Sequence, residues 1–97
     1  MKIPQFQRTI AEKLVGKNKQ MGAQFLMNVL VEEVGELSRA LRKGTTDEVA
    51  EEVCDIIFAV TSIANLRGVD VEPFLKRKYI DRPLSEISRE WTDVSWR

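Results

Sequence analysis

Four acidic side chains stand in two pairs whose spacing suits a shared site. Glu33 and Glu36 are three residues apart, and so are Glu52 and Asp55. Residues three apart on a helix are neighbours on its surface, so each pair offers two carboxylates to one place. Carboxylate oxygens suit Mg²⁺ or Mn²⁺, and bound magnesium usually completes its shell with water and substrate phosphates. The spacing therefore indicates metal-assisted hydrolysis of a phosphate compound.

Glu33 is the most unusual of these residues because it falls inside an apolar stripe. On a helix it projects between leucines that lie within about 60° of one another, and Glu36 lies at the edge of the stripe. The leucines of this stripe are Leu26, Leu30, Leu37 and Leu41. Acid pairs three apart more often face solvent and pair with lysines, and this interpretation stays open. Carboxylates gathered in a partly buried place have to be protonated, paired with cations or bound to a metal.

Helical periodicity predicts an all-α protein, because strand and hairpin signals are weak. We expect four helices and a less certain fifth, at residues 4–16, 21–43, 47–68, 71–79 and 84–91, with Thr45 or Thr46 capping the third and Asp70 the fourth. The Gly44–Thr46 turn should make the second and third helices antiparallel neighbours. Glu36 and Glu52 then lie at similar heights, so the four carboxylates converge midway along this central hairpin.

The third predicted helix is apolar on two sides, since residues 56–66 carry no charge. In a small domain such a helix is most simply covered by a second copy of the chain, which predicts an oligomeric helical bundle. The length of 97 residues suits one domain over residues 1–97, with 81–97 as a less certain C-terminal extension.

The composition excludes several classes of function. The chain has no histidine, which rules out Ser-His-Asp and Cys-His catalysis and histidine-ligated zinc. Its one cysteine, Cys54, excludes an internal disulfide. The 15 basic and 15 acidic residues balance, so nothing favours a nucleic-acid or membrane partner. No apolar run is long enough to span a membrane, and we expect a cytoplasmic protein.

Two short motifs carry a resemblance to a known family. EEVGE (Glu32 to Glu36), followed after fifteen residues by EVCD (Glu52 to Asp55) and then by IANLRGVD, resembles the EExxE…ExxD signature of the MazG-like nucleoside triphosphate pyrophosphohydrolases. The similarity covers about residues 20–80. It implies an all-α homodimer or homotetramer that cleaves the α–β phosphoanhydride of (deoxy)nucleoside triphosphates with Mg²⁺, or with Mn²⁺ in its place, to give monophosphate and pyrophosphate.

Carried over by position, the resemblance assigns roles to named residues. The family's metal ligands fall on Glu33, Glu36, Glu52 and Asp55. One of the carboxylates, with Glu36 and Glu33 as candidates, would orient or deprotonate the attacking water, and Glu32 would have a supporting place. The family's basic stretch falls near Tyr79 and predicts substrate-binding residues at Lys76, Lys78 and Arg82. A solvated helix end is an equally good interpretation of these cations.

Some alternatives stay open at the level of sequence. The motif is also compatible with a non-catalytic helical metal-binding or interaction scaffold, and with an enzyme that hydrolyses another nucleotide through the same metal site. The last fifteen residues lie outside the resemblance. Their Trp91 and Trp96 would stack on a base, cover a neighbouring subunit or belong to a simple tail.

Overall fold

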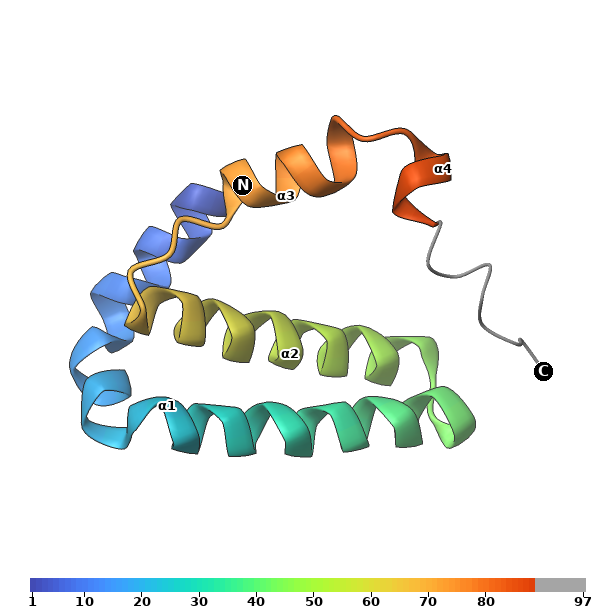
Figure 1. Ribbon diagram of the computed structural model, residues 1–97. Coiled ribbons are helices and arrows are strands. Elements are labelled where there is room, and N and C mark those ends of the chain that lie inside the picture. Colours follow the sequence, from blue (N-terminus) through green and yellow to red (C-terminus); the bar gives the residue numbers. More distant parts are fainter. Residues whose placement is uncertain (89–97) are drawn as a thin grey trace.

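The apolar periodicity of the sequence becomes two long helices followed by three short helical segments. The computed structural model describes residues 1–88, apart from the side chain of Val15. The helices are α1 (Ile3–Lys43), α2 (Thr46–Leu66), α3 (Glu72–Leu75), the π-helical turn η1 (Lys76–Ile80) and α4 (Leu84–Ile87) (Figure 1). Because the described residues form no strand, the predicted all-α class is confirmed.

Helix α1 bends sharply at Gly22, which has φ +85° and ψ 167°. Only glycine adopts a positive φ of this kind at little cost, so the bend is encoded locally. We predicted two helices separated at residues 17–20. The structure instead continues the first helix through Gly16 and places the break at Gly22. Gly16 keeps helical geometry, since a glycine weakens a helix without ending it.

The turn between α1 and α2 is built from Gly44 and Thr45. The amide of Gly44 donates to the carbonyl of Ala40 at 2.8 Å. A Cβ atom on Gly44 would lie 2.9 Å from that same carbonyl oxygen, so the close approach favours glycine. The hydroxyl of Thr45 accepts the amide of Glu48 at 3.2 Å and caps α2, as one of the two predicted caps.

Helix α2 lies alongside the C-terminal half of α1, and the chain reverses direction at the turn (Figure 1). Small side chains mark where the two helices meet. Ala40 of α1 is 6% exposed, and Ala59 and Ser62 of α2 are 1% and 0% exposed. Leu26 is also buried, but Leu41 of the predicted stripe is 68% exposed. Leu41 follows buried Ala40 directly and is therefore turned about 100° away from the interface.

Apolar residues on the other side of α2 are left partly exposed by the described residues 1–88. Val53, Ile57 and Val60 are 39–46% exposed. This surface agrees with a helix that is apolar on two sides, and its coverage by a second copy stays a prediction.

The N-terminal half of α1 is fastened to the end of α2 by a network of hydrogen bonds around buried Gln7. The Gln7 Nε2 group donates to Asn65 Oδ1 at 3.2 Å and to the carbonyl of Val69 at 2.9 Å. Gln7 Oε1 accepts the amide of Val71 at 3.0 Å, and Asn65 Nδ2 donates to the carbonyl of Gln7 at 2.9 Å. The network joins the start of α1 to the end of α2 and the loop that follows it, 58 to 64 residues further along the chain.

The C-terminal segments differ from their predicted bounds. Val71, not Asp70, is the N-cap of α3, and no side chain there makes a capping hydrogen bond. The predicted helix over 71–79 is a short α-helix that widens into a π-turn, in which the amide of Asp81 reaches the carbonyl of Lys76 at 2.9 Å. Helix α4 ends at Ile87. The predicted continuation to Trp91, and Trp96, lie outside the described residues.

None of the helices within residues 1–88 combines the length and the apolar character that a membrane span requires.

Candidate active site

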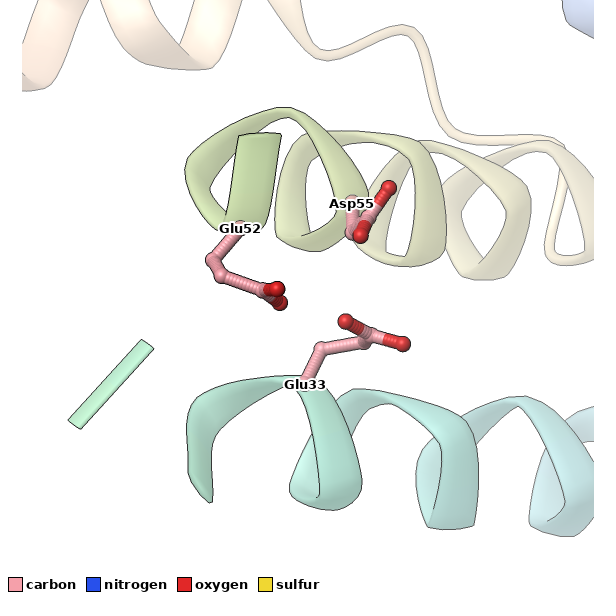
Figure 2. A group of neighbouring side chains, drawn as sticks. All are labelled: Glu33, Glu52 and Asp55. Atoms are coloured by element: carbon pink, nitrogen blue, oxygen red, sulfur yellow. The ribbon is translucent and has the colours of Figure 1, made fainter. Parts of the chain in front are cut away.

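Three of the four predicted carboxylates meet between α1 and α2. Glu33 comes from α1, and Glu52 and Asp55 come from consecutive turns of α2. Figure 2 shows their side chains directed toward one another across the space between the helices. One carboxylate oxygen from each residue lies within 4.8 Å of those from the other two. We call these three residues the acidic cluster.

The acidic cluster is incompletely satisfied by the protein itself. Glu33 and Glu52 are half-buried, whereas Asp55 is exposed. The Oε2 atom of Glu52 is buried and has no hydrogen-bond partner among residues 1–88. Burying a charged oxygen without a partner is costly, and such an atom needs a proton, a donor or a cation. The cluster therefore has room and chemical need for a positively charged ligand.

Electrostatics at Glu33 lead to the same conclusion. Burial raises the pKa of Glu33 above its ordinary value of 4.5. The neighbouring Glu52 carboxyl raises this pKa further, as do the negative charges of Asp55 and Glu32. Each of these causes disfavours the ionised form, and a bound cation would oppose the repulsion between the charges.

The donor set suits a hard divalent cation. Three carboxylates supply oxygen ligands only, which Mg²⁺ and Mn²⁺ accept and which soft metals do not prefer. The unpartnered oxygen of Glu52 is the structural observation that supports this fit. Exposed Asp55 leaves one side of the cluster accessible, as a site that also takes water and substrate oxygens requires.

Glu36 and Glu32 take different places around the acidic cluster. Glu36 is exposed and is not part of the three-residue group, but it lines a pocket together with Glu52. Its role as a metal ligand or as a base stays a prediction. Glu32 is exposed, and its charge contributes to the raised pKa of Glu33.

Two hollows border the acidic cluster, and they differ in chemistry. A polar pocket of about 290 Å³ lies toward the α1–α2 turn and is lined by Glu36, Arg39, Ala40, Lys43, Gly44, Glu48 and Glu52. An apolar groove of about 860 Å³ lies on the Asp55 side, between α2, the N-terminal end of α1 and α3. Its lining includes Phe6, Ile57, Phe58 and Leu75.

The basic residues predicted from the family resemblance line neither hollow. Lys76 forms an exposed ion pair with Asp81 at 3.0 Å, and Arg82 lies 3.8 Å from Glu86. The ammonium group of Lys78 lies 5.7 Å from the centre of the Tyr79 ring. Their contact with substrate phosphates stays a prediction that nothing in the structure tests.

Sequence reasoning overlooked Arg39, Lys43 and Phe6 as neighbours of the site. Arg39 stands three residues after Glu36 and Lys43 a further four, which is the spacing of one helix face. That spacing is a usable signal for the two cations. No sequence pattern pointed to Phe6, because its approach to α2 depends on the bend at Gly22.

Comparison with known proteins agrees with this geometry. The model of the MazG nucleotide pyrophosphohydrolase domain matches residues 21–83, about two thirds of the chain. The matched region contains the whole acidic cluster, the C-terminal half of α1 and all of α2. No curated protein matches the sequence.

Proposed function

Because the chain belongs to the MazG nucleotide pyrophosphohydrolase family, we propose that it hydrolyses (deoxy)nucleoside triphosphates at the α–β phosphoanhydride, giving monophosphate and pyrophosphate. The family establishes a nucleotide pyrophosphohydrolase at a coarse level. The bond cleaved, the substrate class and the dependence on Mg²⁺ belong to the proposal.

The observation that supports it most is the acidic cluster with its unpartnered buried oxygen on Glu52. Glu33, Glu52 and Asp55 would hold the metal, with Mg²⁺ as the expected ion and Mn²⁺ as a substitute. When bound, such an ion polarises phosphate oxygens, lowers the pKa of water and orients the substrate.

The protein's own residues then have separate tasks. Through the cation that it would hold, the acidic cluster would position the reacting phosphates between α1 and α2. Glu36, exposed and beside Glu52 in the polar pocket, would accept a proton from the attacking water, with Glu33 as the second candidate. The water oxygen bonds to phosphorus, the bridging P–O bond breaks, and its electron pair leaves with the departing phosphate.

The apolar groove beside Asp55 supports a nucleotide over a simple polyphosphate. Phe6 and Phe58 line it together with Gln7 and Thr61. Aromatic rings offer stacking surface to a base, and the hydroxyl of Thr61 offers a hydrogen bond, whereas the Gln7 amide is already engaged within the fold. Because Asp55 belongs to both the acidic cluster and the groove, phosphates at the cluster place the nucleoside toward these side chains.

Assembly into a homodimer or homotetramer is also part of the proposal. Four apolar residues on one face of α1, Met27, Val31, Val34 and Leu41, are 46–68% exposed. With Ser38 they follow the alternating four- and three-residue spacing of a helix-packing seam. A second copy that covered this seam would remove a continuous apolar surface from water.

A product analysis tests the proposed reaction. The purified chain is incubated with each of the eight common triphosphates and Mg²⁺, and products are separated by ion-exchange chromatography. We expect monophosphate and pyrophosphate, and no product with EDTA or with Glu33→Gln. Glu51→Gln, which removes the same charge at an exposed position of α2 outside the acidic cluster, is the matched control and should remain active.

The other outcomes are equally informative. Diphosphate with orthophosphate would mean that a different bond is cleaved. Absence of product, combined with stabilisation by Mg²⁺ in thermal unfolding, would direct the search to other nucleotides. Absence of both would leave a non-catalytic scaffold.

A further inference from the structure

The polar pocket at the α1–α2 turn is lined by two cationic side chains that have no role in the proposed reaction as described above. Arg39 and Lys43 lie four residues apart on α1, so their side chains share one face of the helix. Both line the pocket, and neither forms an ion pair with any residue between 1 and 88. Their positive charges are therefore available to a ligand.

The pocket is continuous with the acidic cluster through Glu52, which belongs to both. The buried Oε2 atom of Glu52 lacks a partner on this boundary. On the other side of the cluster, Asp55 borders the apolar groove. The three regions follow one another in the order apolar groove, acidic cluster and polar pocket, which is the order of base, reacting phosphates and terminal phosphates in a nucleoside triphosphate.

We propose that Arg39 and Lys43 form the subsite for the two terminal phosphates of the substrate, and thus for the pyrophosphate that leaves. The inference rests on the proposed function. Arginine offers a planar fork of N–H donors to two phosphate oxygens, and lysine offers a mobile point charge. Together they would hold the leaving phosphates in line with the attacked bond and balance the charge that develops on them.

The charges of the pocket make this subsite dependent on a divalent cation. Arg39 and Lys43 share the pocket with Glu36, Glu48 and Glu52, so carboxylates outnumber cations. Free pyrophosphate would be repelled by them. A cation at the acidic cluster reverses this balance, and the ligand of the pocket is therefore pyrophosphate together with Mg²⁺ rather than pyrophosphate alone.

The surroundings distinguish these two cations from the basic residues nearer the C-terminus. Lys76 and Arg82 are engaged by Asp81 and Glu86 on an exposed surface. Arg39 and Lys43 instead lie in a pocket that opens onto the acidic cluster. The structure therefore assigns binding of the leaving phosphates to residues of α1 rather than to residues of η1.

Calorimetric titration of the metal-loaded protein with inorganic pyrophosphate tests the assignment without relying on turnover. Arg39→Gln and Lys43→Gln should each weaken pyrophosphate binding at least about tenfold in the presence of Mg²⁺. Arg42→Gln is the matched control, because Arg42 is an exposed cation on the same turn of α1 that does not line the pocket. Its affinity should equal that of the unaltered protein. Omitting Mg²⁺ should abolish binding in all of them.

Product inhibition supplies a second readout. In the Arg39 and Lys43 variants, inhibition by pyrophosphate should weaken about tenfold, whereas inhibition by the monophosphate product should stay unchanged. Both residues are exposed, so the variants should fold, and thermal unfolding checks this. Unchanged pyrophosphate affinity in both variants would overturn the subsite while leaving the hydrolase intact. Failure of the unaltered protein to cleave any triphosphate would instead overturn the proposed function.

Discussion

Two polar clusters connect α1 with α2, and they are satisfied in opposite ways. Around Gln7, four hydrogen bonds of 2.9–3.2 Å join neutral amides and backbone groups. Around Glu33, three carboxylates face one another, and the buried Oε2 atom of Glu52 has no partner. Both clusters lie between the same two helices, so their difference comes from side-chain chemistry rather than from position in the fold.

The comparison teaches how to separate structural from functional polarity in a small helical protein. A neutral network that satisfies its own donors and acceptors stabilises the folded chain and leaves nothing for a ligand. A group of like charges costs folding free energy, and that cost is recovered only when a cation arrives. Changing either cluster should therefore alter different properties of the protein.

The largest effect is expected from Glu52→Gln. It removes one charge from the acidic cluster and should lower turnover at least about a hundredfold, because a metal ligand matters more than its outer-shell supports. Stabilisation by Mg²⁺, about 2.7 kcal/mol at a concentration one hundred times Kd, should also disappear. Turnover assays measure the loss of activity, and thermal unfolding with and without Mg²⁺ measures the loss of stabilisation.

Glu51→Gln controls for the change in net charge. Glu51 directly precedes Glu52 on α2, is exposed and does not belong to the acidic cluster. Equal losses in the two variants would show that net charge, rather than ligation by Glu52, explains the effect.

The second effect is loss of stability in Gln7→Ala. This substitution removes the three hydrogen bonds of the Gln7 side-chain amide and leaves its partner groups on Asn65, Val69 and Val71 unsatisfied. We expect a decrease of about 2–4 kcal/mol in the free energy of unfolding, measured by denaturant titration. Mg²⁺ should still stabilise the variant. Gln20→Ala, at an exposed position of α1, should change stability by less than about 0.5 kcal/mol.

The spacing of the acidic residues, with the apolar stripe around Glu33, predicted most of the acidic cluster, but it also included Glu36, which lies outside the three-residue group. Glu52 and Asp55 share one helix, Glu33 another, and a short turn fixes how the two helices face each other, so local rules reach all three residues. The network of Gln7 and Asn65 could not be predicted in this way, because these residues are 58 positions apart and meet only after the backbone bends at Gly22.

Helix ends depend on the acceptor and on the donor. Thr45 was predictable as a cap because its hydroxyl accepts the amide three residues ahead. Asp70 has an equally suitable carboxylate, but the residue three ahead of it is Pro73, which has no amide hydrogen, and α3 begins one residue later.

A third, smaller effect concerns pH. Since the pKa of Glu33 is raised above 4.5 in the folded chain, the folded state binds more protons than the unfolded state in the range between the two values. The contribution of Glu33 to the stability of the metal-free protein is therefore fully present below about pH 4.5 and is lost as the pH rises through the folded pKa. Denaturant titrations from pH 4 to 8 without metal measure this decline.

Glu33→Gln should lose less stability over that range and should equal or exceed the unaltered protein at neutral pH, because the repulsion within the acidic cluster is relieved. Parallel pH profiles for the two proteins would contradict this origin of the shift.

The smallest effect is expected from Ser62→Ala. Ser62 is fully buried between the helices, and its Oγ atom has no hydrogen-bond partner. Removing an unsatisfied hydroxyl while keeping a small side chain should raise the free energy of unfolding by up to about 1 kcal/mol. Ser62→Val, which enlarges the side chain at the same place, should lower it. Destabilisation by alanine would show that the hydroxyl has a partner in solution.

The bend at Gly22 determines whether the chain can close on itself. A straight helix of 41 residues would extend about 62 Å at 1.5 Å per residue, yet the longest dimension of the molecule is 43 Å. Without the positive φ of Gly22, Gln7 would point away from its own Asn65. The same hydrogen bonds would then be available only from the Asn65 of another copy, by exchange of N-terminal segments. One glycine thus separates a self-contained fold from an interlocked one.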